Sequence, residues 1–118
     1  MTTPKLVYIA GPYSGPPWRR LINIYRALRA AVTVMCKGHV PWCPHTHTCL
    51  FWICAWGTAW EEYMRISKAQ VLACDWLLYL GPSTGADLER GWAADAGNAV
   101  FTSADDIPCV TDDGRSTE

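Results

Sequence analysis

The sequence has no large excess of charge and no long hydrophobic run. Ten Lys and Arg are balanced by eleven Asp and Glu among 118 residues, so the net charge is −1. A chain without a basic excess is not an electrostatic nucleic-acid binder as a whole. No apolar run reaches the ~18 residues of a transmembrane helix, and the N-terminus has the pattern of a strand and not of a signal peptide. We therefore expect neither nucleic acid nor a membrane as partner.

Repeated cysteine pairs are also missing. The six cysteines stand at positions 36, 43, 49, 54, 74 and 109. Without paired spacing or a signal peptide, they favour buried free thiols in a reducing cytoplasm over a disulfide framework. Half of the residues are hydrophobic, which excludes a disordered chain. The seven tryptophans exceed what one small core takes up, so some are expected in a pocket or a subunit interface.

The length fits one domain, over residues 1–110, followed by a polar tail at 111–118. Strand-like and helix-like hydrophobic patterns alternate along this domain. The expected strands are 5–10, 39–43, 75–80 and 99–102, and the expected helices are 18–37, about 58–73 and 86–96. This alternation predicts an α/β fold with a parallel sheet and helices on both faces. Ligands of such sheets bind at the carboxyl ends of the strands.

The first predicted helix has one apolar side. Its large apolar residues recur at steps of three and four: Leu21, Ile24, Leu28, Val32 and Met35. This spacing indicates an amphipathic helix. Gly38 follows directly, and glycine is a common stop at the end of a helix.

A glycine-containing segment, Gly11–Pro17, follows the first predicted strand. Glycines let the backbone approach a ligand, and the N-terminus of the following helix attracts anions. Ser14 can add a hydroxyl, and Arg19 or Arg20 a positive charge. The segment fits a cradle for a phosphate or a sugar, and equally an ordinary turn between strand and helix.

A second such segment, Gly81–Gly85, leads into the helix that carries Glu89. A carboxylate near the carboxyl end of a parallel sheet can act as nucleophile or base, although most helical glutamates are solvated. Asp75, which opens the third strand, is a candidate second carboxylate or a partner of neighbouring backbone. Two carboxylates with separate roles suit the cleavage of a glycosidic bond.

Cysteine and histidine alternate at Cys43, His45, His47 and Cys49, so all four would face one side of an extended segment. The segment lacks the C-x₂₋₄-C and H-x₃₋₅-H pairs of structural zinc sites. A zinc-binding module is therefore an alternative that we rank below a pocket-lining His45 or simple loop capping, and no metal is assigned.

Four segments resemble, in order, the nucleoside 2-deoxyribosyltransferase-like superfamily: Tyr8–Gly15, Gly38–His47, Cys74–Ala93 and Ala99–Phe101. This superfamily includes nucleoside deoxyribosyltransferases and nucleoside 5′-monophosphate N-glycosidases. The resemblance implies a flavodoxin-like (Rossmann-like) three-layer sandwich with a parallel sheet of four to five strands. It also implies cleavage of the bond between base and sugar, no cofactor, and a homodimer or larger homo-oligomer.

The resemblance also implies roles for single residues. Glu89 matches the nucleophile, Asp75 the aspartate that assists departure of the base, and Tyr8 the tyrosine beside the nucleophile. Ser83 stands where the monophosphate hydrolases tend to carry serine and the nucleoside transferases aspartate. A hydroxyl at a helix N-terminus attracts a phosphate, whereas a carboxylate repels it. The residues expected to bind the substrate are Gly11, Pro12, Tyr13, Ser14, Gly15, Arg19, His45, Ser83 and Gly85.

These observations lead us to expect an N-glycosidase that hydrolyses a (deoxy)nucleoside 5′-monophosphate through Glu89. Trp42, Trp52 or Trp56 can stack on the base, and stacking leaves the identity of the base open. Two alternatives use the same site. One is a deoxyribosyltransferase that exchanges bases, and the other is a protein that binds or sequesters a nucleotide without cleaving it.

Overall fold

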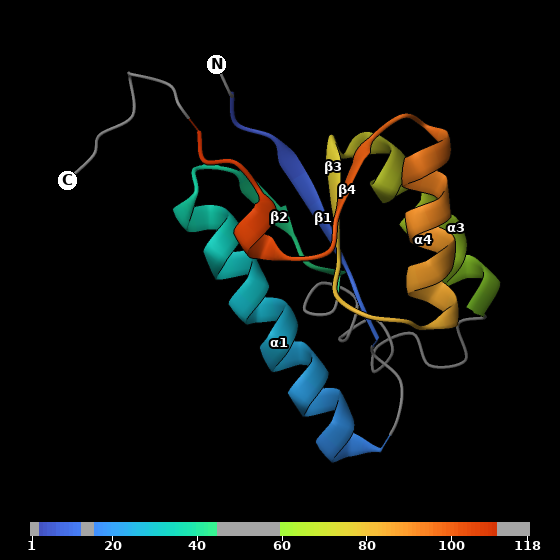
Figure 1. The fold of residues 1–118 in the computed structure, drawn as a ribbon. Helices are drawn as coiled ribbons and strands as arrows, with labels where there is room; N and C mark the ends of the chain where they lie inside the picture. Colours follow the sequence, from blue (N-terminus) through green and yellow to red (C-terminus); the bar gives the residue numbers. More distant parts are fainter. Residues whose placement is uncertain (1–2, 13–15, 45–59, 111–118) are drawn as a thin grey trace.

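Four short strands form one parallel sheet. The computed structural model describes residues 3–12, 16–44 and 60–110 (Figure 1). The strands are β1 (Leu6–Ala10), β2 (Val40–Trp42), β3 (Trp76–Tyr79) and β4 (Ala99–Phe101). They lie in the order β2-β1-β3-β4, and each neighbouring pair is parallel. The predicted α/β fold with a parallel sheet is therefore confirmed, with four strands in the described part of the chain.

The strand order reverses between β1 and β3. The chain passes from β1 outward to β2, then returns to the other side of β1 with β3 and continues to β4. Val7 lies opposite both Pro41 on β2 and Trp76 on β3. Pro41 is tolerated because β2 is an edge strand, where a missing N–H is less costly. Open sheets of this kind bind ligands in the crevice outside the carboxyl ends of the two strands between which the order reverses, and here these strands are β1 and β3.

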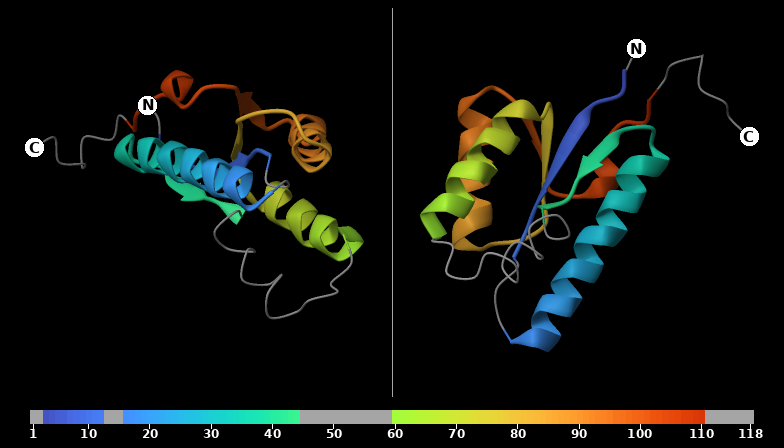
Figure 2. Two further views of the ribbon diagram at one scale, coloured as in Figure 1. Left: turned by 90° about the horizontal axis from the view of Figure 1, so that it is seen from below. Right: turned by 180° about the vertical axis from the view of Figure 1, so that it is seen from behind.

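Helices cover both faces of the sheet. Helix α1 (Pro17–Cys36) and the short 3₁₀ helix η1 (Ala104–Asp106) lie on one side, and α3 (Trp60–Ala73) and α4 (Thr84–Asp95) lie on the other (Figure 2). We call these sides the α1 face and the α3–α4 face. The arrangement is the three-layer sandwich that the sequence predicts. Among the described residues, none of the helices combines the length and apolar character needed to cross a membrane.

Alternating residues of the central strands fill the two cores. Val7 and Ile9 of β1 and Leu78 of β3 are buried on the α1 face. Tyr8 and Leu77, with Ala10, are buried on the α3–α4 face. This is the two-residue period of a strand that is covered on both sides.

The helix ends follow local sequence signals. Gly38 and Gly97 follow the ends of α1 and α4 with positive φ angles of 94° and 82°, a conformation that favours glycine. Ser83 caps α4, since its side chain accepts a hydrogen bond from the Ala86 N–H at 3.0 Å. The stop at Gly38 agrees with the sequence prediction.

The apolar side predicted for α1 points away from the sheet. Leu21, Leu28, Val32 and Met35 are exposed, and Ile24 is only half-buried. The buried residues of α1 are Asn23, Ala27, Ala30, Ala31 and Val34. Small alanine side chains allow the helix backbone to approach the sheet closely, so the large residues are left outside. The usual rule that large apolar residues of an amphipathic helix face the core is reversed here.

Two basic residues after α1 hold the C-terminal part of the domain. The Lys37 ammonium donates to the carbonyl oxygens of Ala104, Asp105 and Ile107 at 2.7–2.9 Å. The buried His39 ring accepts from the Lys5 N–H at 3.0 Å through Nδ1, and its Nε2 lies 2.6 Å from the Pro108 oxygen. These bonds fix η1 on the α1 face, and no motif in the sequence predicts them.

Candidate functional site

A tyrosine and a glutamate are buried together on the α3–α4 face. Tyr8 lies in the middle of β1 and is fully buried, and Glu89 lies in the second turn of α4 and is 8% exposed. The Tyr8 hydroxyl donates to Glu89 Oε2 at 2.6 Å. This short distance is typical of a hydroxyl bound to a charged oxygen. The structure thus brings together two of the three residues expected in catalysis.

Burial changes the acidity of both groups. The pKa of Glu89 is raised to about 7, mainly because burial disfavours its charged form, while hydrogen bonds from Tyr8 and Ser67 oppose the shift. The pKa of Tyr8 is raised far above its usual range by burial and by the neighbouring Glu89 carboxylate. Tyr8 therefore stays protonated and keeps donating. Glu89 exchanges its proton near neutral pH, as catalytic carboxyl groups do.

Ser67 of α3 is a third member of this cluster. The Ser67 hydroxyl lies within hydrogen-bonding reach of both Tyr8 and Glu89, and donation to either one lowers the pKa of that group. No sequence motif marks Ser67, because a lone serine inside a helix belongs to no recognisable pattern. It is found only when α3 and α4 are seen packed side by side (Figure 1).

The loops that follow β1 and β3 touch each other next to the crevice. The Leu80 N–H donates to the Ala10 oxygen at 2.7 Å. A Cβ at Gly11 would lie 3.1 Å from the Cβ of Leu80, which is closer than such contacts normally are. A Cβ at Gly81 would lie 3.4 Å from the Pro12 ring. The glycines thus let the two loops meet at the switch point.

The first turn of α4 directly follows the loop after β3 and carries the predicted ligand residues Ser83 and Gly85. Ser83, at its N-cap, is half-buried, and its hydroxyl hydrogen remains available because the oxygen is the acceptor toward Ala86. Gly85 lies in the same turn, and a Cβ there would come within 3.8 Å of Met64. On the outside, the Tyr79 hydroxyl donates to Asp87 at 2.6 Å, and Arg90 lies over the Tyr79 ring.

The structure does not bring Asp75 to Glu89. Asp75 precedes β3, and its exposed carboxylate accepts from the Leu6 N–H at 2.9 Å. Its own N–H donates to the Leu6 oxygen at 2.8 Å. Asp75 therefore binds the backbone at the amino ends of β1 and β3, whereas the crevice lies at their carboxyl ends. The backbone-binding alternative that we considered for Asp75 describes what the structure contains.

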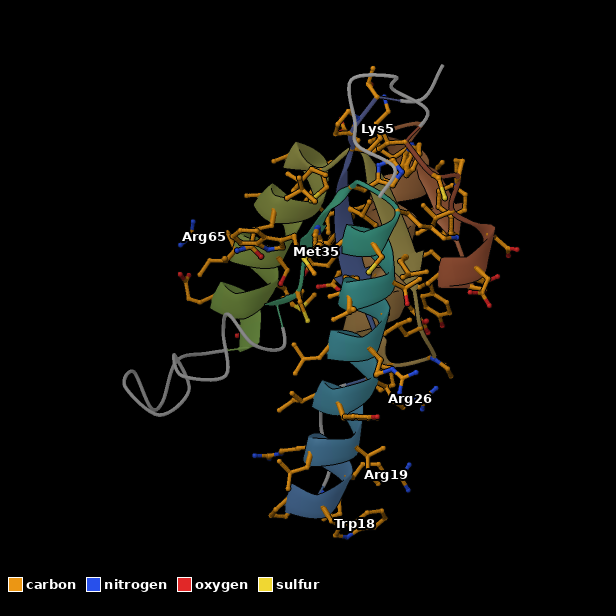
Figure 3. The ribbon with its side chains drawn as sticks, turned by 90° about the vertical axis from the view of Figure 1, so that its left-hand side faces the viewer. Lys5, Trp18, Arg19, Arg26, Met35 and Arg65 are labelled. Atoms are coloured by element: carbon orange, nitrogen blue, oxygen red, sulfur yellow. The ribbon has the colours of Figure 1, made fainter. Side chains whose placement is uncertain are left out.

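Arg19 and Trp42 are further predicted ligand residues that the structure describes. Arg19 is exposed in the first turn of α1, where its guanidinium stacks 5.0 Å from the Trp18 ring (Figure 3). Trp42, at the end of β2, is half-buried against the cluster of the α3–α4 face. The predicted site residues that lie outside the described residues are Tyr13, Ser14, Gly15 and His45, together with Trp52 and Trp56. Among the described residues no group of His, Cys, Asp or Glu side chains is arranged to hold a metal.

The arrangement therefore offers one carboxyl group that is held by two hydroxyls and is withdrawn from bulk water. Ionised Glu89 can act as a nucleophile or a base, and Tyr8 and Ser67 fix its orientation. A family model described as a domain of unknown function, DUF4406, matches residues 5–102. No curated protein matches the chain.

Proposed function

The chain belongs to this domain family of unknown function, DUF4406, and we propose that it is an N-glycosidase acting on a (deoxy)nucleoside 5′-monophosphate. The single observation that carries the proposal is the buried Glu89 carboxyl, hydrogen-bonded to Tyr8 at 2.6 Å beside the switch point of the sheet. A buried carboxyl is costly for stability, so its retention fits a chemical task.

In the proposed reaction, ionised Glu89 attacks C1′ of the sugar. The bond between C1′ and the base nitrogen breaks, and the base leaves with the electron pair and takes up a proton from solvent. The resulting glycosyl ester at Glu89 is then hydrolysed by water, which releases the sugar phosphate and restores the carboxylate. Tyr8 and Ser67 act as positioning residues that hold Glu89. Asp75 has no role in the proposed reaction, because its side chain is bound to backbone at the amino ends of β1 and β3.

The preference for a monophosphate rests on Ser83. Its hydroxyl stands at the N-terminus of α4, where the partial positive charge of the helix favours an anion. A carboxylate at this position would repel a phosphate dianion. Trp42 is a candidate for stacking on the base, since it lies on the same face of the sheet. A nucleotide pool in the cytoplasm fits this assignment.

The experiment is a mass-spectrometric screen of nucleosides and their 5′-monophosphates for release of free base. We expect release from at least one monophosphate, and loss of release by at least about a thousandfold in Glu89→Gln. Asp95→Asn is the matched control, since it changes an exposed carboxylate on the same helix to an amide. Nucleotide binding without any base release would contradict the enzymatic proposal.

A second free base, added to the same reaction, separates hydrolysis from base exchange. A hydrolase gives free sugar phosphate whether or not the second base is present. A transferase gives a new nucleotide that contains the added base. The latter result would keep Glu89 as nucleophile but change the proposed reaction.

A further inference from the structure

Helix α1 buries one polar side chain, that of Asn23, which is 7% exposed. Asn23 is also the first buried residue of the helix, since none of residues 17–22 is buried. Within the described part of the chain its side-chain amide makes no hydrogen bond. Buried amides in proteins are normally hydrogen-bonded, because an unpaired one costs free energy. Asn23 therefore indicates a polar partner that the described residues do not supply.

The place of Asn23 along α1 brings its side chain to the carboxyl ends of the strands. Ala27, one turn later on the same side, belongs to the core cluster that contains Ile9 near the end of β1. Leu80, directly after β3, packs against the same cluster. Because α1 joins two parallel strands, it runs back along the sheet, and its N-terminal part extends past the strand ends (Figure 1). Asn23 lies about 6 Å closer than Ala27 to that end of the helix, at the level of the loops that meet at the switch point.

The sheet-facing side of α1 changes from apolar to polar at this level. Along the sheet it consists of small apolar residues: Ala27, Ala30, Ala31 and Val34. One turn before Ala27 this side carries Asn23, and three residues earlier the half-buried Arg20. A side that served packing alone would stay apolar over its whole length. The change indicates that α1 meets a polar ligand where it passes the strand ends.

The proposed function determines which part of a nucleotide would lie here. Glu89 takes C1′ and Ser83 takes the phosphate, and both are carried by α4 and its N-cap. In a displacement at C1′, the nucleophile and the leaving base stand on opposite sides of the carbon, so the base is directed away from Glu89. Helix α1 covers the face of the sheet opposite to α4 (Figure 2). This makes Asn23 the candidate to meet the base.

We propose that Asn23 binds the edge of the nucleobase and is a specificity-determining residue of the site, an inference that rests on the proposed function. The side-chain amide offers N–H donors and a carbonyl acceptor side by side. The edge of a base presents an adjacent donor and acceptor, so two hydrogen bonds form together. A phosphate dianion presents acceptors only and would leave the buried Asn23 oxygen unpaired. The neutral amide therefore fits the base better than the phosphate.

The test is isothermal titration calorimetry of the full chain in the Glu89→Gln background, where the nucleotide is not consumed. The probes are the 5′-monophosphates of the common deoxynucleosides and 2-deoxyribose 5-phosphate, which lacks a base. For the monophosphate that binds most tightly, we expect Asn23→Ala to raise the dissociation constant at least about tenfold. Binding of 2-deoxyribose 5-phosphate should be unchanged. Thr33→Ala is the matched control, because it removes a hydroxyl that is hydrogen-bonded within α1.

A second variant and a stability measurement separate binding from a structural role. Asn23→Asp keeps the shape of the side chain but replaces its N–H donors with a carboxylate oxygen, and we expect a similar loss of binding. In urea unfolding without nucleotide, Asn23→Ala should have a free energy of unfolding close to that of the wild type. The described residues provide no hydrogen bond to lose, and alanine favours the helix.

An unchanged dissociation constant in Asn23→Ala, or an equal rise for 2-deoxyribose 5-phosphate, would overturn the assignment to the base. A marked loss of stability in nucleotide-free Asn23→Ala would show a structural role and would overturn it as well. A chain that binds none of the probes would overturn both this inference and the proposed function. Nucleotide binding that depends on Asn23, without base release by the wild type, would contradict the enzymatic proposal alone.

Discussion

The two faces of the sheet use alternate residues of the same strands, yet they bury different chemistry. On the α1 face, β1 contributes the apolar side chains of Val7 and Ile9 to the core. On the α3–α4 face it contributes Tyr8, whose hydroxyl is bound to the buried Glu89. Burying a carboxyl group costs free energy that an apolar side chain of similar size would not.

The difference indicates a division of labour between the faces. The α1 face provides stability through close packing of small and branched side chains. The α3–α4 face gives up part of that stability to keep a carboxyl with a pKa of about 7 beside the switch point. Changes on the first face should therefore affect folding, and changes on the second should mainly affect chemistry.

The largest effect on stability is expected on the α1 face. Ile9→Ala removes three methyl or methylene groups from a fully buried position and leaves a cavity, so we expect a loss of about 2–5 kcal/mol in the free energy of unfolding. Urea unfolding measures this loss. Base release by the fraction that remains folded should be unchanged, and a selective loss of activity would contradict the division between the faces.

The pH dependence of stability should differ between wild type and Glu89→Gln. In the folded chain the pKa of Glu89 is raised from 4.5 to about 7, so the folded state holds this proton more tightly than the unfolded state. The contribution of Glu89 to the free energy of unfolding is therefore greatest below pH 4.5. It falls by about 3 kcal/mol as the pH rises from there through about 7. Glu89→Gln lacks this loss, so its stability relative to wild type should increase from pH 5 to pH 8. If the difference in stability between wild type and Glu89→Gln were the same at pH 5 and pH 8, the raised pKa of Glu89 would be contradicted.

A smaller effect is expected on substrate choice at the N-terminus of α4. Ser83→Asp keeps a good N-cap, so the helix should be preserved. The new carboxylate should lower kcat/KM for the monophosphate relative to the free nucleoside by at least about tenfold, which is about 1.4 kcal/mol. Ser83→Asn is the control, because it also caps the helix but carries no charge. Similar losses in both variants would place the phosphate elsewhere.

The smallest effect is expected from Ser67. The hydrogen bond from Ser67 lowers the pKa of Glu89, so Ser67→Ala should raise that pKa and move the rising limb of the pH–rate profile to higher pH. The profile of kcat/KM against pH measures the shift, with Ala69→Ser as a variant of an exposed position on the same helix. A uniform fall in rate without a shifted profile would show that Ser67 does not act through the acidity of Glu89.

Much of the fold follows from local signals in the sequence. The strands begin and end within one or two residues of their predicted limits because they are short apolar runs between turn residues. The ends of α1 and α4 follow from Gly38 and Gly97, which both adopt positive φ. The pairing of Tyr8 with Glu89 was an expectation from the family resemblance, and the two residues are in contact.

Other features depend on contacts that no local pattern encodes. Periodicity locates the apolar side of α1 but does not tell which side meets the sheet, and here the alanine side does. Asp75 directly precedes the third strand in sequence, so it lies at the amino ends of the strands. The crevice lies at their carboxyl ends, and Asp75 is therefore on the opposite side of the sheet's strand ends from it. Ser67 joins the site only because α3 packs against α4.

The most direct test of the central claim is to identify the residue that carries the sugar. A reaction with a (deoxy)nucleoside 5′-monophosphate is quenched rapidly in acid, and peptides of the chain are analysed by mass spectrometry. We predict a sugar phosphate attached to the peptide that contains Glu89, and no such adduct in Glu89→Gln. An adduct on another residue, or base release at the wild-type rate by Glu89→Gln, would contradict the account.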